Sequence, residues 1–142
     1  MRNKAGRVPE RLLDIQESID NARNDLGALT KEQFLTDGKT QRAVIESIIV
    51  IGESANNVMR LAPELERNSP VAWQYFKDAY DMRIILAHEY FRVDVAVVWD
   101  TVKNDLPKLE SSLASISITK EDCGDRAGSA AAGGTPPPIV GP

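Results

Sequence analysis

The run from Arg83 to Phe91 carries the residues whose chemistry is easiest to interpret. It contains a guanidinium at Arg83, the chain's only imidazole at His88 and a phenol at Tyr90. Arginine offers a phosphate two parallel N–H donors, and histidine gains and loses a proton near neutral pH. These side chains are therefore suited to cleaving a phosphate ester by proton transfer and charge stabilisation.

The spacing of these residues limits what one helix can do. At about 100° per residue, Tyr90 lies almost in line with Arg83, whereas His88 is turned away from Arg83 by about 140°. One helix therefore does not bring the three groups to one point. Convergence needs a groove completed by another surface, and a two-fold related copy of the same helix is the simplest candidate. We therefore expect a homodimer.

RNA is a substrate that such a dimer could cleave without a metal ion. The ribose 2′-hydroxyl acts as the nucleophile, so the enzyme must supply a base, an acid and stabilisation of the phosphorane. A dimer offers His88 of one chain as the base and His88 of the partner subunit as the acid. The alternative is a packed or surface histidine beside Leu86 and Phe91, which is the commoner role of a lone histidine in a helix.

Composition excludes several other classes of protein. One histidine and one cysteine, Cys123, leave too few ligands for the usual zinc sites, and we expect neither a metal nor a cofactor. The net charge of -4 and the pI near 5.0 argue against indiscriminate coating of nucleic acid, although a local basic site is compatible with them. No apolar run suits a signal peptide or a membrane span, so we expect a cytoplasmic protein.

The elements that must position these residues are all predicted to be helices. Pro9 suits the first turn of a helix, and Gly27 ends that helix after about eighteen residues. The Thr-Lys-Glu-Gln run at 30–33 matches a capping box that begins a short helical turn. Asp37–Gly38 then interrupts the helical structure. Apolar residues recur every three or four positions in the first helix, at Leu12, Ile15, Ile19, Ala22 and Leu26.

Three further signals complete the predicted architecture. A long helix over residues 39–61 has apolar residues on more than one stripe, which predicts packing against two neighbours and makes it the most buried element. The next helix starts at Ser69–Pro70, and Asp94 caps a last one in which Pro107 is predicted to cause a kink or a break. The fold class is therefore predicted to be all-α, an antiparallel bundle of four to five helices.

The chain of 142 residues is expected to contain one folded domain, residues 8–118. A domain of this size can bury a self-sufficient core without disulfides. From Asp122 onward Gly, Ala, Ser and Pro dominate, and this composition has too little apolar content to offset the entropy lost on ordering. Residues 119–142 are therefore predicted to be a disordered Gly/Ala/Pro-rich tail.

Arg83, His88 and Tyr90 together resemble the R-x4-H-x-Y motif of HepT-type proteins, the toxin half of HepT/MntA toxin–antitoxin pairs in the HEPN superfamily. The likeness covers roughly residues 8–115, and its combined motifs are more specific than any one of them. The other segments that resemble the family are Ile51–Ala55, which is similar to its G-E-A segment, Trp73 ahead of Met82–Arg83, Glu89–Asp94, Val98–Trp99 and Asp105–Pro107.

The resemblance implies a HEPN-like helical homodimer that acts as a metal-independent endoribonuclease, with Arg83 and His88 as the catalytic pair in a cleft between protomers. It also implies a partner, an MntA-like minimal nucleotidyltransferase antitoxin that adenylylates Tyr90 in a type VII-like toxin–antitoxin pair. Such a modification would place bulk and negative charge where an RNA phosphate should lie beside Arg83. It would therefore block RNA binding and weaken transition-state stabilisation together.

Two positions depart from the family pattern. Ile84 stands where a polar residue, often Asn or Asp, usually follows the motif arginine, and Asp81 stands where glycine is common. If that polar residue orients the substrate or the histidine, either the activity of this chain is weak, or another side chain such as Asp81 or Glu53 substitutes for it. Ile84 also favours an alternative function, in which the chain is a non-catalytic helical module that binds nucleotide or docks the nucleotidyltransferase.

Glu53 is a candidate supporting residue because of its neighbour. Gly52 has no side chain and would let two helices approach, so that Glu53 could orient Arg83 or His88 through a charge-assisted hydrogen bond. The other interpretation is a solvated glutamate beside a packing glycine. The cations that could add basic potential around the cleft, or could simply be solvated, are Lys77, Arg60 and Arg92.

Overall fold

The computed structural model describes residues 4–89 and 92–116. Within these residues the chain is helical and contains no strand, which confirms the predicted all-α fold class. The predicted tail, residues 119–142, and Tyr90 lie outside the described residues. The elements are α1 (Lys4–Leu26), α2 (Lys31–Phe34), α3 (Gly38–Leu61), α4 (Leu65–Asn68), α5 (Pro70–His88), α6 (Val95–Asp100), the π-helical segment η2 (Thr101–Asp105) and α7 (Leu106–Ser115).

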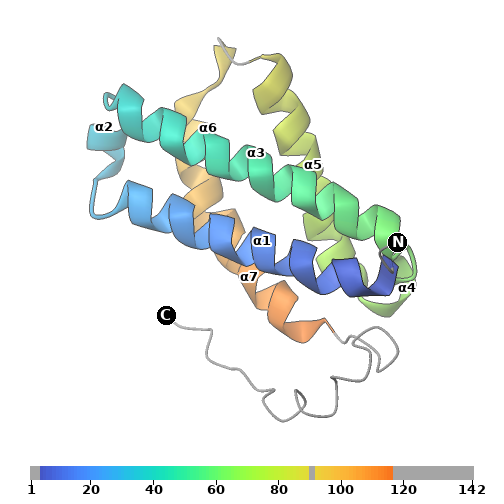
Figure 1. The fold of residues 1–142 in the computed structure, drawn as a ribbon. Helices are drawn as coiled ribbons and strands as arrows, with labels where there is room; N and C mark the ends of the chain where they lie inside the picture. The colour runs from blue at the N-terminus through green and yellow to red at the C-terminus, as the bar shows by residue number, and fades with distance from the viewer. Residues whose placement is uncertain (1–3, 90–91, 117–142) are drawn as a thin grey trace.

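The long helices form two crossing layers (Figure 1). α1 and α3 run side by side and antiparallel in one layer, while α5 and the continuous α6–η2–α7 run form the other. α3 packs against both α1 and α5 and has the largest set of buried residues among the described helices. The prediction that this helix is the most buried element, with two neighbours, is therefore confirmed.

The core lies where the two layers meet. Trp73 and Trp99 are half-buried and pack against it. None of the described helices is both long enough and apolar enough to cross a membrane. The largest fully buried side chains of the core come from α1, α2, α3, α5 and α6. They are Phe34, Phe76, Ile15, Ile19, Ile48, Ile51, Leu86, Val44, Val58 and Val98.

The first helix begins earlier than predicted. α1 starts at Lys4, so Pro9 lies inside the helix instead of in its first turn. The fixed φ of proline is compatible with a helix, and this position loses one backbone hydrogen bond near the helix start. The predicted stop at Gly27 is confirmed, because Gly27 has a φ of 56° and donates its N–H to the carbonyl of Arg23 at 2.9 Å.

The connection between α1 and α3 contains the predicted capping box and a second cap that was not predicted. Thr30 and Gln33 form the expected capping box at the start of α2. Asp37 then caps α3, because its carboxylate accepts a hydrogen bond from the backbone N–H of Thr40 at 3.0 Å. This bond lowers the pKa of Asp37 below its ordinary value. The cap therefore contributes stability above the ordinary carboxyl pKa and loses it as pH falls through the lowered value.

The last helical run has the predicted cap at Asp94 and the predicted interruption at Pro107. Asp94 caps α6 as expected, through a hydrogen bond from the backbone N–H of Ala96 at 2.9 Å. The regular α-helix is interrupted at Pro107, as predicted, although helical backbone continues through the interruption. The turn before Pro107 widens into η2, where the N–H of Leu106 bonds to the carbonyl of Thr101, five residues earlier. Pro107 then occupies a position at the start of α7, where its missing N–H costs little.

The start of α5 agrees with the prediction, except for the cap. Ser69 precedes the helix and Pro70 begins it, but the Ser69 side chain makes no capping hydrogen bond. α4, a single turn over Leu65–Asn68 that directly precedes α5, was not predicted. One turn is too short to produce a recognisable apolar period.

Candidate functional site

The site is built where α3 crosses α5 at Gly52. A Cβ atom added to Gly52 would overlap the Cβ of Arg83 and would lie 2.6 Å from the carbonyl oxygen of Ala79. Only glycine therefore permits this spacing between the helices. The close approach expected at Gly52 is confirmed, and it places the root of the Arg83 side chain directly against α3.

Glu53, the next residue of α3, engages Arg83. Its Oε1 lies 3.2 Å from the Nε of Arg83. This Nε atom is fully covered and has no partner in hydrogen-bond geometry, so the contact is an ion pair without a formal hydrogen bond. The side chain of Glu53 is 49% exposed and that of Arg83 is 32% exposed. Among the described residues nothing pairs with the terminal amino groups of Arg83, which leaves them available to an anion.

The other predicted site residues are not gathered at this point. His88 is the last residue of α5 and is exposed, and among the described residues no hydrogen bond or ion pair engages it. Asp81 is exposed on the same helix and likewise makes no such contact with the described residues. Tyr90 lies outside the described residues. The structure thus brings Glu53 to Arg83, and does not bring His88 or Asp81 to them within one chain.

Tyr80 and Ile84 occupy the surface of α5 between the two motif residues. On a regular helix they are turned from Arg83 by about 60° and 100°, on the way to His88 at about 140°. Both are half-buried, yet neither is among the apolar side chains that pack against the core. We call this surface the Tyr80–Ile84 strip.

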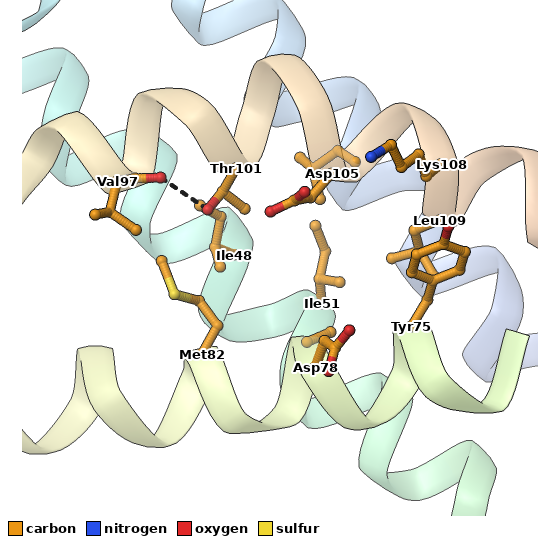
Figure 2. A pocket seen from close by; sticks show the side chains of 12 residues that line it. Ile48, Ile51, Tyr75, Asp78, Met82, Val97, Thr101, Asp105, Lys108 and Leu109 are labelled. Atoms are coloured by element: carbon orange, nitrogen blue, oxygen red, sulfur yellow. Dashed lines mark hydrogen bonds between the residues drawn. The ribbon is translucent and has the colours of Figure 1, made fainter. Parts of the chain in front are cut away.

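A cavity of about 450 Å³ lies on a different face of α5, between α5, α3 and the α6–η2–α7 run (Figure 2). Figure 2 shows Asp78 on α5 and Asp105 on η2 reaching toward the cavity from its two walls. Two carboxylates with one nearby cation, Lys108, make this space unfavourable for a phosphate. The full lining is Ile48, Ile51, Tyr75, Asp78, Ala79, Met82, Val97, Thr101, Asp105, Leu106, Lys108 and Leu109.

None of the predicted site residues lines this cavity, and its polar groups were not predicted to have a role. The only sequence signal that bears on it is Pro107, whose neighbours Asp105 and Leu106 contribute to the wall. Within the described residues, no three or more His, Cys, Asp and Glu side chains are grouped to hold a metal ion.

The packing at Gly52 leads to a stability prediction. Gly52→Ala should lower the free energy of unfolding by about 2 kcal/mol or more, because the added methyl overlaps Arg83 and the Ala79 carbonyl and forces α3 and α5 apart. Urea unfolding followed by tryptophan fluorescence measures this change. Gly38→Ala is the matched control, since its Cβ would meet only the flexible end of Arg42, at 3.3 Å. Equal stability of the two variants would contradict the close packing.

Comparison with known proteins connects these residues to a family. The profile of the ribonuclease HepT-like family matches residues 15–116. Among curated proteins, the chain is similar to the "Probable ribonuclease HepT" of Thermococcus cleftensis, with 38% identity over 109 residues that cover 74% of this chain and 91% of that protein. No solved structure gives a significant match.

Two further relatives carry related names. One, from Methanocaldococcus jannaschii, is named "Gamma-glutamylcyclotransferase and putative RNase"; it is 36% identical over 103 residues, which are 72% of this chain and 44% of that protein. The other is a "Putative RNase" of Caldanaerobacter subterraneus, 34% identical over 85 residues, which are 60% of this chain and 71% of that protein. The family profile and these identities together show that this helical chain belongs to the ribonuclease HepT-like family.

Proposed function

We propose that this chain is a cytoplasmic endoribonuclease that needs no metal ion, that it works as a homodimer, and that Arg83 and His88 are its catalytic pair. Membership of a ribonuclease family supports the activity. The observation that carries the assignment of residues is the position of Arg83, which Gly52 and Glu53 hold against α3 with its terminal amino groups unengaged by the described residues. A guanidinium fixed in this way is suited to bind a phosphate in the substrate and in the transition state.

The proposed reaction is a transfer within the RNA strand. The ribose 2′-oxygen attacks the adjacent phosphorus while His88 of one protomer takes the 2′-hydroxyl proton. The bond from phosphorus to the 5′-oxygen then breaks, and His88 of the partner subunit gives that oxygen a proton. Arg83 stabilises the negative charge that develops on the phosphorane. The products are a 2′,3′-cyclic phosphate and a free 5′-hydroxyl, and no other reactant is consumed.

The homodimer is needed because one chain does not gather the catalytic groups. Arg83 and His88 are about 140° apart around α5. The Tyr80–Ile84 strip between them is half-buried without packing against the core, which suits a surface that a second protomer covers. A partner lying over this strip would have both motif residues at its edges.

We further propose that the chain is the toxin of a toxin–antitoxin pair and that an MntA-like minimal nucleotidyltransferase silences it by adenylylating Tyr90. The R-x4-H-x-Y spacing supports this regulation, because Tyr90 follows Arg83 by seven residues and both belong to the same motif. A nucleotide phosphate on Tyr90 would compete with the RNA phosphate for the Arg83 guanidinium.

The alternative function is a non-catalytic helical module that binds nucleotide or docks the transferase. Ile84 favours it, because this position lacks the polar side chain that usually follows the motif arginine in the family. The exposed His88, which no described residue orients, is compatible with it as well. Cleavage assays separate the two functions.

Substitution of either member of the catalytic pair should remove RNA cleavage. His88→Ala and Arg83→Ala are each expected to lower kcat by about 10²-fold to 10⁴-fold, as loss of proton transfer or charge stabilisation requires. The assay follows a labelled single-stranded RNA in the presence of a metal chelator. Gln74→Ala, an exposed change on the same helix, controls for folding and for contaminating nuclease. Equal cleavage by all the proteins, or none by any, would reject the enzyme in favour of the non-catalytic module.

The dimer makes a separate prediction. Ile84→Asp places a charge on the Tyr80–Ile84 strip, and we expect it to produce monomers and to abolish cleavage while leaving the helical content unchanged, because Ile84 does not pack against the core. Light scattering gives the mass, and circular dichroism gives the fold. A monomeric Ile84→Asp protein that cleaves RNA at the full rate per chain would show that no second protomer is required.

The regulation is tested by intact mass spectrometry. Incubation with the cognate nucleotidyltransferase and ATP should add one or more adenylyl groups and abolish RNA cleavage. The Tyr90→Phe variant should gain no mass, and it should stay active, because it keeps Arg83 and His88. An adenylyl increment that persists in Tyr90→Phe would assign the modification to another residue.

A further inference from the structure

A second group of arginines lies at the crossing of the first half of α1 with the end of α3. Arg7 and Arg11 of α1 and Arg60 of α3 surround a cavity of about 110 Å³, together with Asn57 and Leu61. At about 30 Å³ for each water molecule, this volume holds three to four waters, which is the scale of a single phosphate group. The cavity contains none of the residues of the catalytic proposal.

The charges around this cavity are not balanced. Arg11 pairs with Asp14 at 3.0 Å and more distantly with Glu10 at 3.9 Å. Its Nε atom is fully covered and has no hydrogen-bond partner in the structure. Among the described residues, no ion pair engages the guanidinium of Arg7 or of Arg60, and both residues are exposed. Three guanidiniums against two carboxylates leave an excess positive charge in a chain whose net charge is -4.

We propose that this arginine cavity binds a backbone phosphate of the RNA strand, as a second anchoring point beside the catalytic site. The assignment rests on the proposed ribonuclease function. Like charges that gather around one small space repel each other unless an anion occupies it. The forked N–H donors of arginine fit phosphate oxygens, and the Asn57 amide adds a neutral donor. A phosphate therefore matches both the size and the charge of the cavity.

The register of α3 connects this cavity to the catalytic site. Glu53, Asn57 and Arg60 follow one another at i, i+4 and i+7, so they lie along one outward ridge of α3. Arg83 lies on the α5 side of this ridge, and the cavity opens on its α1 side. Seven residues of helix span about 10 Å, so one short strand can lie over both points. The cavity therefore contributes to RNA binding without contacting the bond that breaks.

RNA binding tests this proposal most directly. A fluorescent single-stranded RNA is titrated against the full chain carrying His88→Ala, so that the RNA stays intact, and anisotropy is measured over a series of salt concentrations. Adding Arg7→Gln and Arg60→Gln together should weaken binding about 10-fold. It should also reduce the slope of log affinity against log salt concentration by the amount that corresponds to one to two phosphate contacts. Restoring the charge with lysine at both positions should recover most of the affinity.

The matched control removes the same two charges elsewhere. Arg42→Gln with Arg67→Gln, both exposed and outside the cavity, should change the affinity less than twofold. If the control pair weakens binding as much as the cavity pair, the effect is general electrostatics and the proposal fails. Unchanged affinity in the cavity pair would also overturn it.

Cleavage kinetics separate this inference from the proposed function. In the chain with native His88, the cavity pair should raise KM about 10-fold while kcat stays within twofold, because the cavity acts on the bound strand alone. A fall in kcat with unchanged KM would refute an anchoring role. If the native chain cleaves no RNA, the proposed function fails, and the binding titration still decides whether the cavity holds a phosphate.

Discussion

The close approach of α3 to α5 at Gly52 determines where the candidate site can form. The missing side chain lets the Cβ of Arg83 and the carbonyl of Ala79 lie directly against α3, and the Nε of Arg83 is fully covered. Glu53 follows Gly52 in the chain and therefore reaches ion-pair distance from the same guanidinium. Arg83 is thus held by the packing of two long helices, and its orientation does not depend on a loop.

α5 also separates two electrostatic environments. Ile84 is turned from Tyr75 by about 180° on the helix, so the Tyr80–Ile84 strip and the large cavity lie on opposite sides of α5. Asp78 and Asp105 line the cavity, whereas Arg83 and the arginine cavity flank the outward ridge of α3. The phosphates of an RNA strand are repelled by the carboxylates of the large cavity and attracted by the arginines beside the ridge of α3. In the proposed function, this acidic chain therefore binds RNA through a local positive surface.

The sequence predicts those features that depend on local contacts. Thr30 and Asp94 begin helices by accepting hydrogen bonds from backbone N–H groups three and two residues away, and Gly27 ends a helix through its positive φ. One distant contact was predicted, the close approach of two helices at Gly52. Other features were not: Arg7 approaches Arg60 only because α1 packs on α3, and the interruption at Pro107 takes the form of a π-helical turn. The motif gave Arg83 and His88 as candidates, but no local pattern could give the arginine cavity.

The contact between Glu53 and Arg83 changes how the isoleucine at position 84 is interpreted. As a replacement for a polar residue beside the motif arginine, it removes a group that could orient the guanidinium, but Glu53 already contacts the Nε of Arg83 from α3. A second polar group at position 84 would point about 100° away from Arg83, toward the strip that the proposed partner covers. Burying a polar group there would cost free energy unless the partner supplied a hydrogen bond, whereas an isoleucine gains from being covered. In the proposed dimer, the departure from the family pattern therefore strengthens the contact between protomers while Glu53 keeps the arginine in place.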